Sequence, residues 1–226
     1  MILNIDTSTN VCSVALTEGN EVLAHKMILG TNEHASKLTV LIESMLKEKH
    51  VVMSELKAVA VSSGPGSYTG LRIGISTAKG ICYALSLPLI AVGTLDIIAQ
   101  GLFSKCPEAM YAVAMIDARR MEVYSQIISR TGEKLTDVEA QIIDASSYST
   151  YLADKELHFC GNGTDKCADI ITSPNAKFIP EIYPLAQYMA SLSDEKYKEG
   201  QFEDVAYFEP FYLKEFVATV AKNKIF

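Results

Sequence analysis

The chain has 226 residues, of which 49% are hydrophobic and 21% charged, with only 13 glycines and 7 prolines. This composition excludes a disordered, collagen-like or low-complexity protein and predicts a globular chain whose core needs no disulfide or cofactor. The formal net charge of −7 argues against a broad basic face for nucleic acid, while a small local contact with RNA stays open.

The cysteines and the apolar runs predict a cytoplasmic protein without a membrane anchor. The cysteine number is odd and no CxxC pair occurs, which is typical of reduced thiols. The first residues lack the basic and apolar regions of a signal peptide, and the longest apolar run, 81–92, is broken by Pro88 before it reaches the roughly 18 residues of a span. The five thiols are Cys12, Cys82, Cys106, Cys160 and Cys167.

The first half of the chain predicts both strands and helices. Short β-rich runs are separated by polar turn clusters, and from Glu33 onward apolar residues recur every three or four positions, as in an amphipathic helix. The predicted order is three antiparallel strands, a helix, a strand, a helix, a strand and a helix, at residues 2–5, 11–16, 22–29, 33–49, 58–61, 68–86, 89–92 and 95–103.

The second half predicts an imperfect repeat of that order. Strands are expected at 111–116, 122–129, 138–143 and 157–160, and helices at 146–153, 165–171 and 183–198. No repeat is visible in the residues themselves, so the duplication rests on element order alone. The tail at 208–226 begins with an aromatic run that is expected to pack back on the body.

Two loops are candidates for chemistry. The cluster Asp6-Thr7-Ser8-Thr9 follows the first strand, where its hydroxyls and N–H groups could bind phosphate. Taken alone, the cluster favours an Asx turn that closes a hairpin. Residues 62–72 read SSGPGSYTGLR and join a buried strand to a helix N-terminus, which favours anions. This loop lacks the lysine of a Walker A motif, so a purely structural turn is an equal interpretation.

The helix after this loop carries small residues four positions apart, at Gly70, Gly74, Ala78 and Cys82. Such a stripe lets another element approach closely, and that element is either the chain's own sheet or another subunit. The broad apolar face of the preceding helix, which includes Val40, favours another subunit. We therefore expect Gly74→Leu to block association while the monomer stays folded.

Metal and nucleophile sites are not predicted. The four histidines, at positions 25, 34, 50 and 158, are scattered and form no HxxxH or HExxH pair. No serine lies in a GxSxG elbow and no cysteine has a histidine close in sequence. The cysteines are interpreted as small core residues.

Four segments occur in one order: IDTST at 5–9, SGPGSYTGLRIG at 63–74, DAR at 117–119 before EVY, and GNG at 161–163. Together they resemble the TsaB family of bacterial tRNA threonylcarbamoyladenosine biosynthesis proteins, also called YeaZ and grouped with M22 glycoproteases. The resemblance covers residues 1 to about 215, and the twelve-residue run is highly specific.

The resemblance implies an α/β fold of the actin and sugar-kinase (ASKHA) type, with two lobes that each have a mixed β-sheet flanked by helices. The lobes are expected at 1–103 and 104–226. The family's role is that of a non-catalytic scaffold or activator, which pairs with the catalytic paralogue TsaD, supports the ATPase TsaE, and forms a homodimer when alone. The complex modifies adenosine 37 of tRNAs that read codons beginning with A, and tRNA is reached only through the complex.

The resemblance also implies that this chain lacks the transfer chemistry. The two metal-binding histidines of the catalytic paralogue correspond to about Thr94 and Ile98, which do not replace imidazole ligands. The resemblance implies that no cofactor is required. Binding of ATP or ADP in the cleft between the lobes is the alternative. Arg119 is bulky where related kinases have small glycine-rich loops, which argues against a working nucleotide pocket. The cleft residues implied are Asp6, Thr7, Ser8, Thr9, Asp117, Arg119, Gly161 and Gly163.

In this family two helices, here about 33–47 and 69–85, form a bundle with the paralogue or with a second copy. The implied interface residues are Leu38, Leu41, Met45, Leu71, Gly74, Ile75, Ala78 and Cys82. The competing hypothesis is an autonomous enzyme, either an ATP-binding transferase or a peptidase that cleaves its paralogue.

Overall fold

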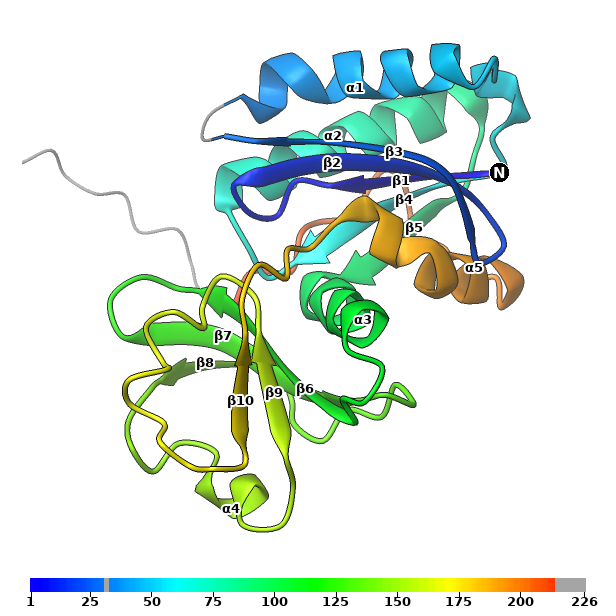
Figure 1. Cartoon of the computed structure of the whole chain (residues 1–226). Helices are drawn as coiled ribbons and strands as arrows, with labels where there is room; N and C mark the ends of the chain where they lie inside the picture. The colour runs from blue at the N-terminus through cyan, green and yellow to red at the C-terminus, as the bar shows by residue number, and fades with distance from the viewer. Residues whose placement is uncertain (31–32, 214–226) are drawn as a thin grey trace, which may run out of the picture.

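The computed structural model describes residues 1–30 and 33–213, which form two five-stranded sheets joined by helices (Figure 1). The first sheet has the order β3-β2-β1-β4-β5. The first three strands are antiparallel, while β1, β4 and β5 run parallel. The bounds are β1 (Ile2–Asp6), β2 (Val11–Glu18), β3 (Glu21–Leu29), β4 (Ala58–Gly64) and β5 (Leu89–Gly93).

Burial explains why these runs are strands and which faces they cover. Every residue of β1 is buried, as expected for a central strand covered on both faces, whereas the edge strand β3 is partly exposed along its length. Helices α1 (His34–Glu48) and α2 (Tyr68–Leu85) pack their apolar stripes on one face of the sheet. The core on this face is therefore built from helix positions three and four apart.

The second sheet repeats the topology of the first. Its order is β10-β9-β6-β7-β8, with β6, β7 and β8 antiparallel and with β9 and β10 parallel to β6. Read from its other edge, this is the same arrangement of a three-stranded meander followed by two parallel strands. The duplication predicted from element order is confirmed. The bounds are β6 (Tyr111–Asp117), β7 (Glu122–Ser129), β8 (Glu139–Ile142), β9 (Leu157–Cys160) and β10 (Ala176–Ile179).

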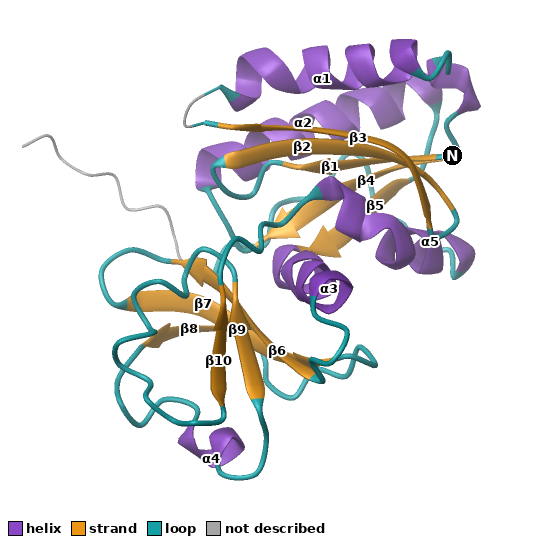
Figure 2. Ribbon diagram, viewed as in Figure 1, coloured by secondary structure: helices purple, strands orange, loops and turns teal. Residues whose placement is uncertain are grey.

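The last helix after each sheet packs largely on the other sheet. Helix α3 (Thr94–Lys105) follows β5, yet Leu95, Ile98 and Leu102 share a core with β6. The 3-10 turn η2 (Ala186–Met189) and helix α5 (Ala190–Lys198) follow β10 but cover the face of the first sheet opposite α1 and α2. Figure 2 shows α3 between the two sheets and α5 beside the first. The packing therefore does not follow a simple division at residues 103 and 104.

Four details of the second half differ from the sequence prediction. The helix expected at 183–198 begins as the 3-10 turn η2 and is α-helical only over α5. The helix expected at 165–171 is a series of turns, in which Lys166 reaches across to the backbone carbonyls of Arg120 and Glu122. The helix expected at 146–153 shrinks to α4 (Ser149–Leu152), because Tyr148 adopts a left-handed φ of 62° just before it. Strand β10 was not predicted, since four residues carry too little periodicity.

The segment before the end of the described chain lies along α2. Val205, Phe208 and Tyr212 pack against the first core, and the Phe211 N–H donates to the Ser63 carbonyl oxygen at 2.7 Å. The Lys79 ammonium donates to two carbonyl oxygens of this segment, at 3.0 and 3.1 Å. The predicted return of the tail is confirmed for 208–213, and residues 214–226 lie outside the described residues.

Four of the five cysteines are buried and all five are free thiols, which confirms their interpretation as core residues for all but the half-buried Cys106. Burial raises the pKa of Cys82 to about 11 and that of Cys12 to about 12. These thiols therefore stay protonated and unreactive at neutral pH. Among the described helices, none is both long and apolar enough to cross a membrane.

The packing of the second half on the first sheet can be tested at Met189, which is fully buried against that sheet. We expect Met189→Ala to lower the free energy of unfolding by about 2–5 kcal/mol, because the lost contacts leave a cavity. Urea unfolding followed by circular dichroism measures the change. The matched variant Met110→Ala, at a side chain 53% exposed, should change it by no more than about 0.5 kcal/mol.

Candidate functional site

Two loops meet where β1 and β4 end. The Ser67 N–H donates to the Ser8 carbonyl oxygen at 2.7 Å, and the Thr7 hydroxyl donates to the Gly70 carbonyl oxygen at 2.7 Å. A Cβ atom at Gly66 or Gly70 would clash with a carbonyl oxygen of the 6–9 loop. The glycines therefore let two backbones touch, and the structural interpretation of the 62–72 loop is the one supported here.

Asp6 is enclosed at this junction. Its side chain is fully buried, and it accepts hydrogen bonds from the Ser8 hydroxyl at 2.9 and 3.2 Å and from the Ser8 N–H at 3.3 Å. Loss of hydration outweighs these bonds and raises the pKa of Asp6 from 3.8 to about 7. The carboxyl group therefore exchanges its proton close to neutral pH instead of near pH 4.

The predicted phosphate side of the cleft does not fit a nucleotide in this conformation. Asp6, Thr7 and Ser8 have no exposed surface, and Thr9 is only 6% exposed. The hydroxyls of Thr7 and Ser8 bond within the protein, and α2 covers Thr7 through the close approach of Gly74. These four residues are brought together, but as part of the core.

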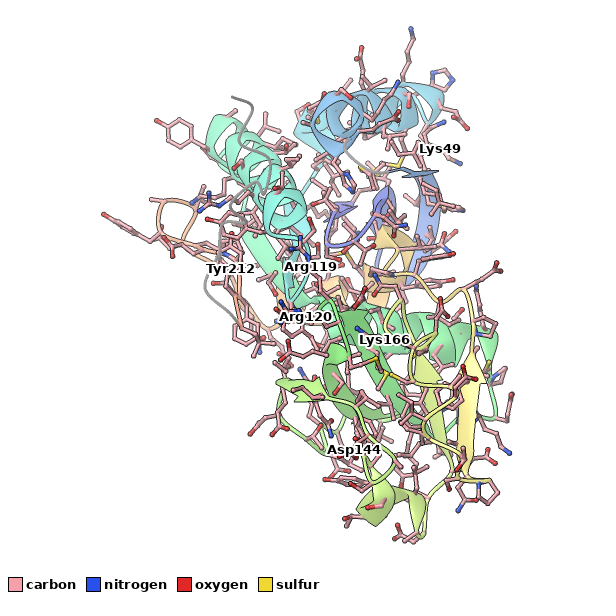
Figure 3. The ribbon with its side chains drawn as sticks, turned by 90° about the vertical axis from the view of Figure 1, so that its left-hand side faces the viewer. Lys49, Arg119, Arg120, Asp144, Lys166 and Tyr212 are labelled. Atoms are coloured by element: carbon pink, nitrogen blue, oxygen red, sulfur yellow. The ribbon has the colours of Figure 1, made fainter. Side chains whose placement is uncertain are left out.

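The second group of predicted cleft residues lies at the end of β6. The Asp117 N–H donates to the Asn162 side-chain oxygen at 3.0 Å, and Lys166 forms an ion pair with the Asp117 carboxylate. Gly161 and Gly163 pack on β6 so closely that a Cβ at Gly161 would clash with the Met115 carbonyl oxygen. The adenosine-side turn is therefore a packing contact, while Arg119 remains exposed (Figure 3).

The positions that correspond to the paralogue's metal ligands lie in the core. Thr94 and Ile98 are both fully buried in α3, and Ile98 packs among apolar side chains that face β6. Within residues 1–30 and 33–213 there is no group of three His, Cys, Asp or Glu side chains suited to a metal ion. Nothing in this donor set fits the metal of the catalytic paralogue.

The predicted interface residues require a correction. Leu38, Met45, Leu71, Gly74, Ile75, Ala78 and Cys82 are buried against the chain's own first sheet, and only Leu41 is partly exposed. A Cβ at Gly74 would clash with the Thr7 hydroxyl, so the small-residue stripe serves the approach of α2 to β1 and β4. The apolar stripe of each helix faces inward because the sheet has a buried face to fill.

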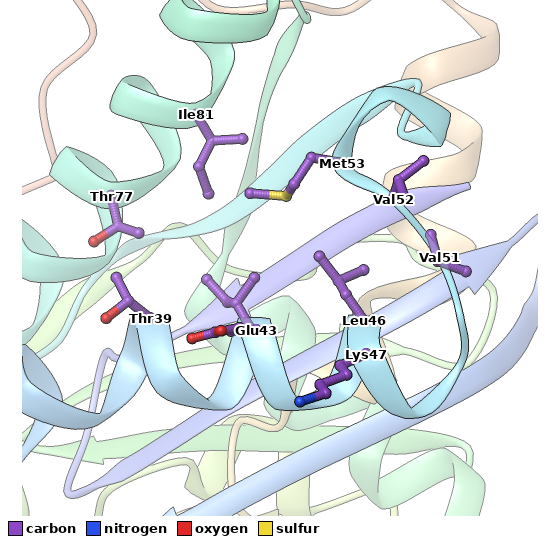
Figure 4. Close-up of a pocket in the computed structure, with 10 residues that line it drawn as sticks. Thr39, Glu43, Leu46, Lys47, Val51, Val52, Met53, Thr77 and Ile81 are labelled. Atoms are coloured by element: carbon purple, nitrogen blue, oxygen red, sulfur yellow. The ribbon is translucent and has the colours of Figure 1, made fainter.

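The surface that these helices leave open is a groove between α1, α2 and the connection to β4, with a volume of about 420 Å³ (Figure 4). Ile42, Leu46, Met53 and Ile81 give it an apolar lining, and Glu43 and Lys47 add charge. Val52 of this lining is 59% exposed, and Val40 on α1 is 54% exposed. Sequence reasoning missed the contribution of residues 51–53, although two valines and a methionine between the elements predicted at 33–49 and 58–61 were a signal. Met53 begins the 3-10 turn η1 (Met53–Glu55).

Comparison with known proteins places the chain in a family. The model of the family "TsaD: tRNA N6-adenosine threonylcarbamoyltransferase" matches residues 29–222. A protein of Haemophilus influenzae named tRNA threonylcarbamoyladenosine biosynthesis protein TsaB is 30% identical over 94% of this chain and 93% of its own length. The chain belongs to the TsaB family. The Escherichia coli TsaB is 42% identical over 54% of this chain, a match that spans about half of that relative's length.

Solved structures agree with this family and its fold. YeaZ from Pseudomonas aeruginosa has a TM-score of 0.82 and 28% identity, over 94% of this chain and 99% of that one. The activator of the 2-hydroxyisocaproyl-CoA dehydratase from Clostridium difficile, with bound ADPNP, has a TM-score of 0.50 at 12% identity over 88% and 96%. The second likeness concerns the fold alone. The predicted two-lobed ASKHA fold is confirmed, and the predicted TsaB resemblance with it.

The close approach of α2 in this TsaB-family chain can be tested with two alanine substitutions on one helix. Gly74→Ala should destabilise the monomer by about 1–3 kcal/mol, since the new methyl group meets the buried Thr7 hydroxyl. Gly80→Ala, where nothing lies within 4 Å, should stabilise it by about 1 kcal/mol through helix propensity. Thermal or urea unfolding measures both. Equal effects at the two positions would contradict the packing.

The buried Asp6 predicts a particular dependence of stability on pH. Because its folded-state pKa is raised, the native protein keeps a proton that the unfolded chain releases above about pH 4, so this group lowers stability as pH rises toward 7. Asp6→Asn, which carries no charge at any pH, should lose less stability between pH 4.5 and 7.5 than the unsubstituted protein. Urea unfolding at several pH values tests this, and parallel profiles would rule it out.

Proposed function

We propose that this chain is a non-catalytic subunit in the formation of N6-threonylcarbamoyladenosine at position 37 of tRNA, and that it acts by binding a TsaD-type catalytic paralogue. The observation that carries the proposal is the open apolar groove between α1 and α2. The similarity to TsaB proteins of tRNA threonylcarbamoyladenosine biosynthesis supports the pathway, and the match to the TsaD family supports a partner of the same fold.

The groove has the chemistry of a helix-docking surface. Its apolar lining includes the exposed Val52, and each aliphatic side chain that becomes fully covered stabilises a complex by about 1.5–3 kcal/mol. A paralogue with the same fold presents an equivalent helix pair, so two such pairs form a bundle. A second copy of this chain fits the same surface in the absence of the paralogue, and a TsaE-type ATPase joins the assembled pair.

The buried cleft loop supports a role without catalysis or a required cofactor. The hydroxyls of Thr7 and Ser8 bond within the protein, and Asp6 is enclosed. ATP or ADP binding by this chain alone would require the 6–9 loop to separate from the 62–72 loop. The chain therefore supports the chemistry of its partner in the cytoplasm and performs none itself.

The groove can be tested with Val52→Asp, at an exposed position of its lining. A carboxylate there would be buried without a partner in the complex, so we expect affinity for the catalytic paralogue to fall at least about 100-fold. Isothermal titration calorimetry with the purified paralogue measures the affinity. Met110→Asp, at an exposed methionine of the second lobe, is the control and should bind normally.

Activity assays separate this proposal from the autonomous enzyme. The purified chain alone should neither turn over ATP nor cleave the paralogue, and modification of tRNA should require both subunits. Full affinity of the Val52→Asp variant would reject the groove as the docking surface. ATP turnover or proteolysis by the chain alone would favour the transferase or the peptidase.

A further inference from the structure

The sequence has only four arginines, and they are used in two different ways. Arg130 is partly buried and donates to the carbonyl oxygens of Ala109, Phe103 and Cys106, at 2.8, 3.4 and 2.7 Å. Its role is to hold the end of α3 and the connection that follows. The other three, Arg72, Arg119 and Arg120, are exposed.

Arg72 is held by two tyrosines. Its guanidinium lies over the Tyr68 ring at 4.1 Å from the centroid, and its Nε–H donates to the Tyr212 hydroxyl at 3.3 Å. The two rings lie 4.9 Å apart. Tyr212 comes from the segment that returns along α2, so this segment fixes the plane of an exposed guanidinium.

Arg119 and Arg120 form the turn between β6 and β7, and both have left-handed backbones, with φ of 71° and 52°. The turn is held from several sides. The Arg119 N–H donates to the Asp117 carboxylate at 2.8 Å, and Lys166 donates to the Arg120 carbonyl oxygen at 2.9 Å. Two consecutive non-glycine residues in this region are rare, and such strain is characteristic of sites where side-chain direction matters.

Tyr212, which Arg72 contacts, lies on the same side of the molecule as the turn that carries Arg119 and Arg120. In Figure 1 the described chain ends beside the β6–β7 turn, and Figure 3, turned by 90°, places Tyr212 near Arg119 and Arg120. Phe211, 47% exposed, adds an aromatic ring. Among the described residues, the acidic groups here include Asp117, which pairs with Lys166, and Glu209, whose charge acts on Arg72. Glu122 directly follows the turn, and its N–H donates to the Arg119 carbonyl oxygen at 3.2 Å. We call Arg72, Arg119 and Arg120, with Tyr212 and Phe211, the arginine corner.

We propose that the arginine corner binds tRNA directly, with the three guanidinium groups on backbone phosphates and the aromatic rings against unstacked bases. Arginine suits this task because its planar fork bonds two phosphate oxygens at once and also stacks on bases. Recognition of RNA by proteins favours single-stranded loops whose bases stack on aromatic and arginine planes. The inference rests on the proposed function, because it assigns a tRNA contact to this subunit.

The net charge of −7 fits a contact of this kind. An acidic chain repels the phosphate backbone over most of its surface, so binding is confined to the place where arginines gather. The RNA is then oriented by one corner of the subunit instead of being held along a broad face. An acidic protein would match the charge as well, but it would not use the ring of Phe211, which is 47% exposed.

The test is binding of an unmodified tRNA transcript with adenosine at position 37, measured by fluorescence anisotropy at several salt concentrations. The full chain is used alone and together with the catalytic paralogue. For Arg119→Gln/Arg120→Gln we expect affinity to fall about tenfold, and the slope of log K against log salt to shrink by about 1.5, as two phosphate contacts are lost. Arg72→Gln should shrink the slope by about half as much.

Lys57→Gln/Lys196→Gln removes the same charge elsewhere and is the matched control, which should leave affinity and slope close to those of the unsubstituted protein. All variants should bind the paralogue normally, which separates this proposal from the groove. Equal losses in the control, or unchanged binding in the arginine variants, would overturn the proposal. So would tRNA binding that an acidic polypeptide displaces as readily as a second RNA does.

Discussion

Contact between two backbones at the end of β1 and β4 determines much of the first lobe. A Cβ atom at Gly66 would meet the Ser8 carbonyl oxygen, and one at Gly70 would meet the Thr7 carbonyl oxygen. The Thr7 hydroxyl likewise lies against the backbone of Gly74. Helix α2 can therefore sit directly on the sheet. The same contact buries Asp6, closes the 6–9 loop to solvent and fixes the start of the helix at Ser67, whose hydroxyl accepts from the Gly70 N–H at 3.2 Å.

This contact also decides which surfaces remain for partners. With the inner stripes of α1 and α2 used by the sheet, only their outer sides and the groove between them are free to meet another protein. The segment that returns along α2 occupies the flank that bears Arg72 and Lys79. The groove and the arginine corner thus lie on different sides of one helix.

Sequence reasoning predicted most of the fold because the first half is strongly periodic. Buried strands such as β4 and helices such as α1 have apolar patterns that few alternatives share. The second half was harder, because Lys166 and Asp117, far apart in sequence, hold a turn where local propensity favours a helix. The sequence also could not show that the small-residue stripe of α2 faces the chain's own sheet. Spacing shows which residues share a face, but the depth of the sheet behind them decides what that face meets.

The placement of α3 and α5 makes each half of the chain depend on a helix from the other half. Each half of a duplicated chain lends its closing helix to the other, as two subunits of a domain-swapped dimer would, but here within one polypeptide. Neither half would be complete after a cut near residue 103, since each would lose the helix that shields one face of its sheet. The two lobes are therefore tied together, because α3 packs on the second sheet and α5 on the first.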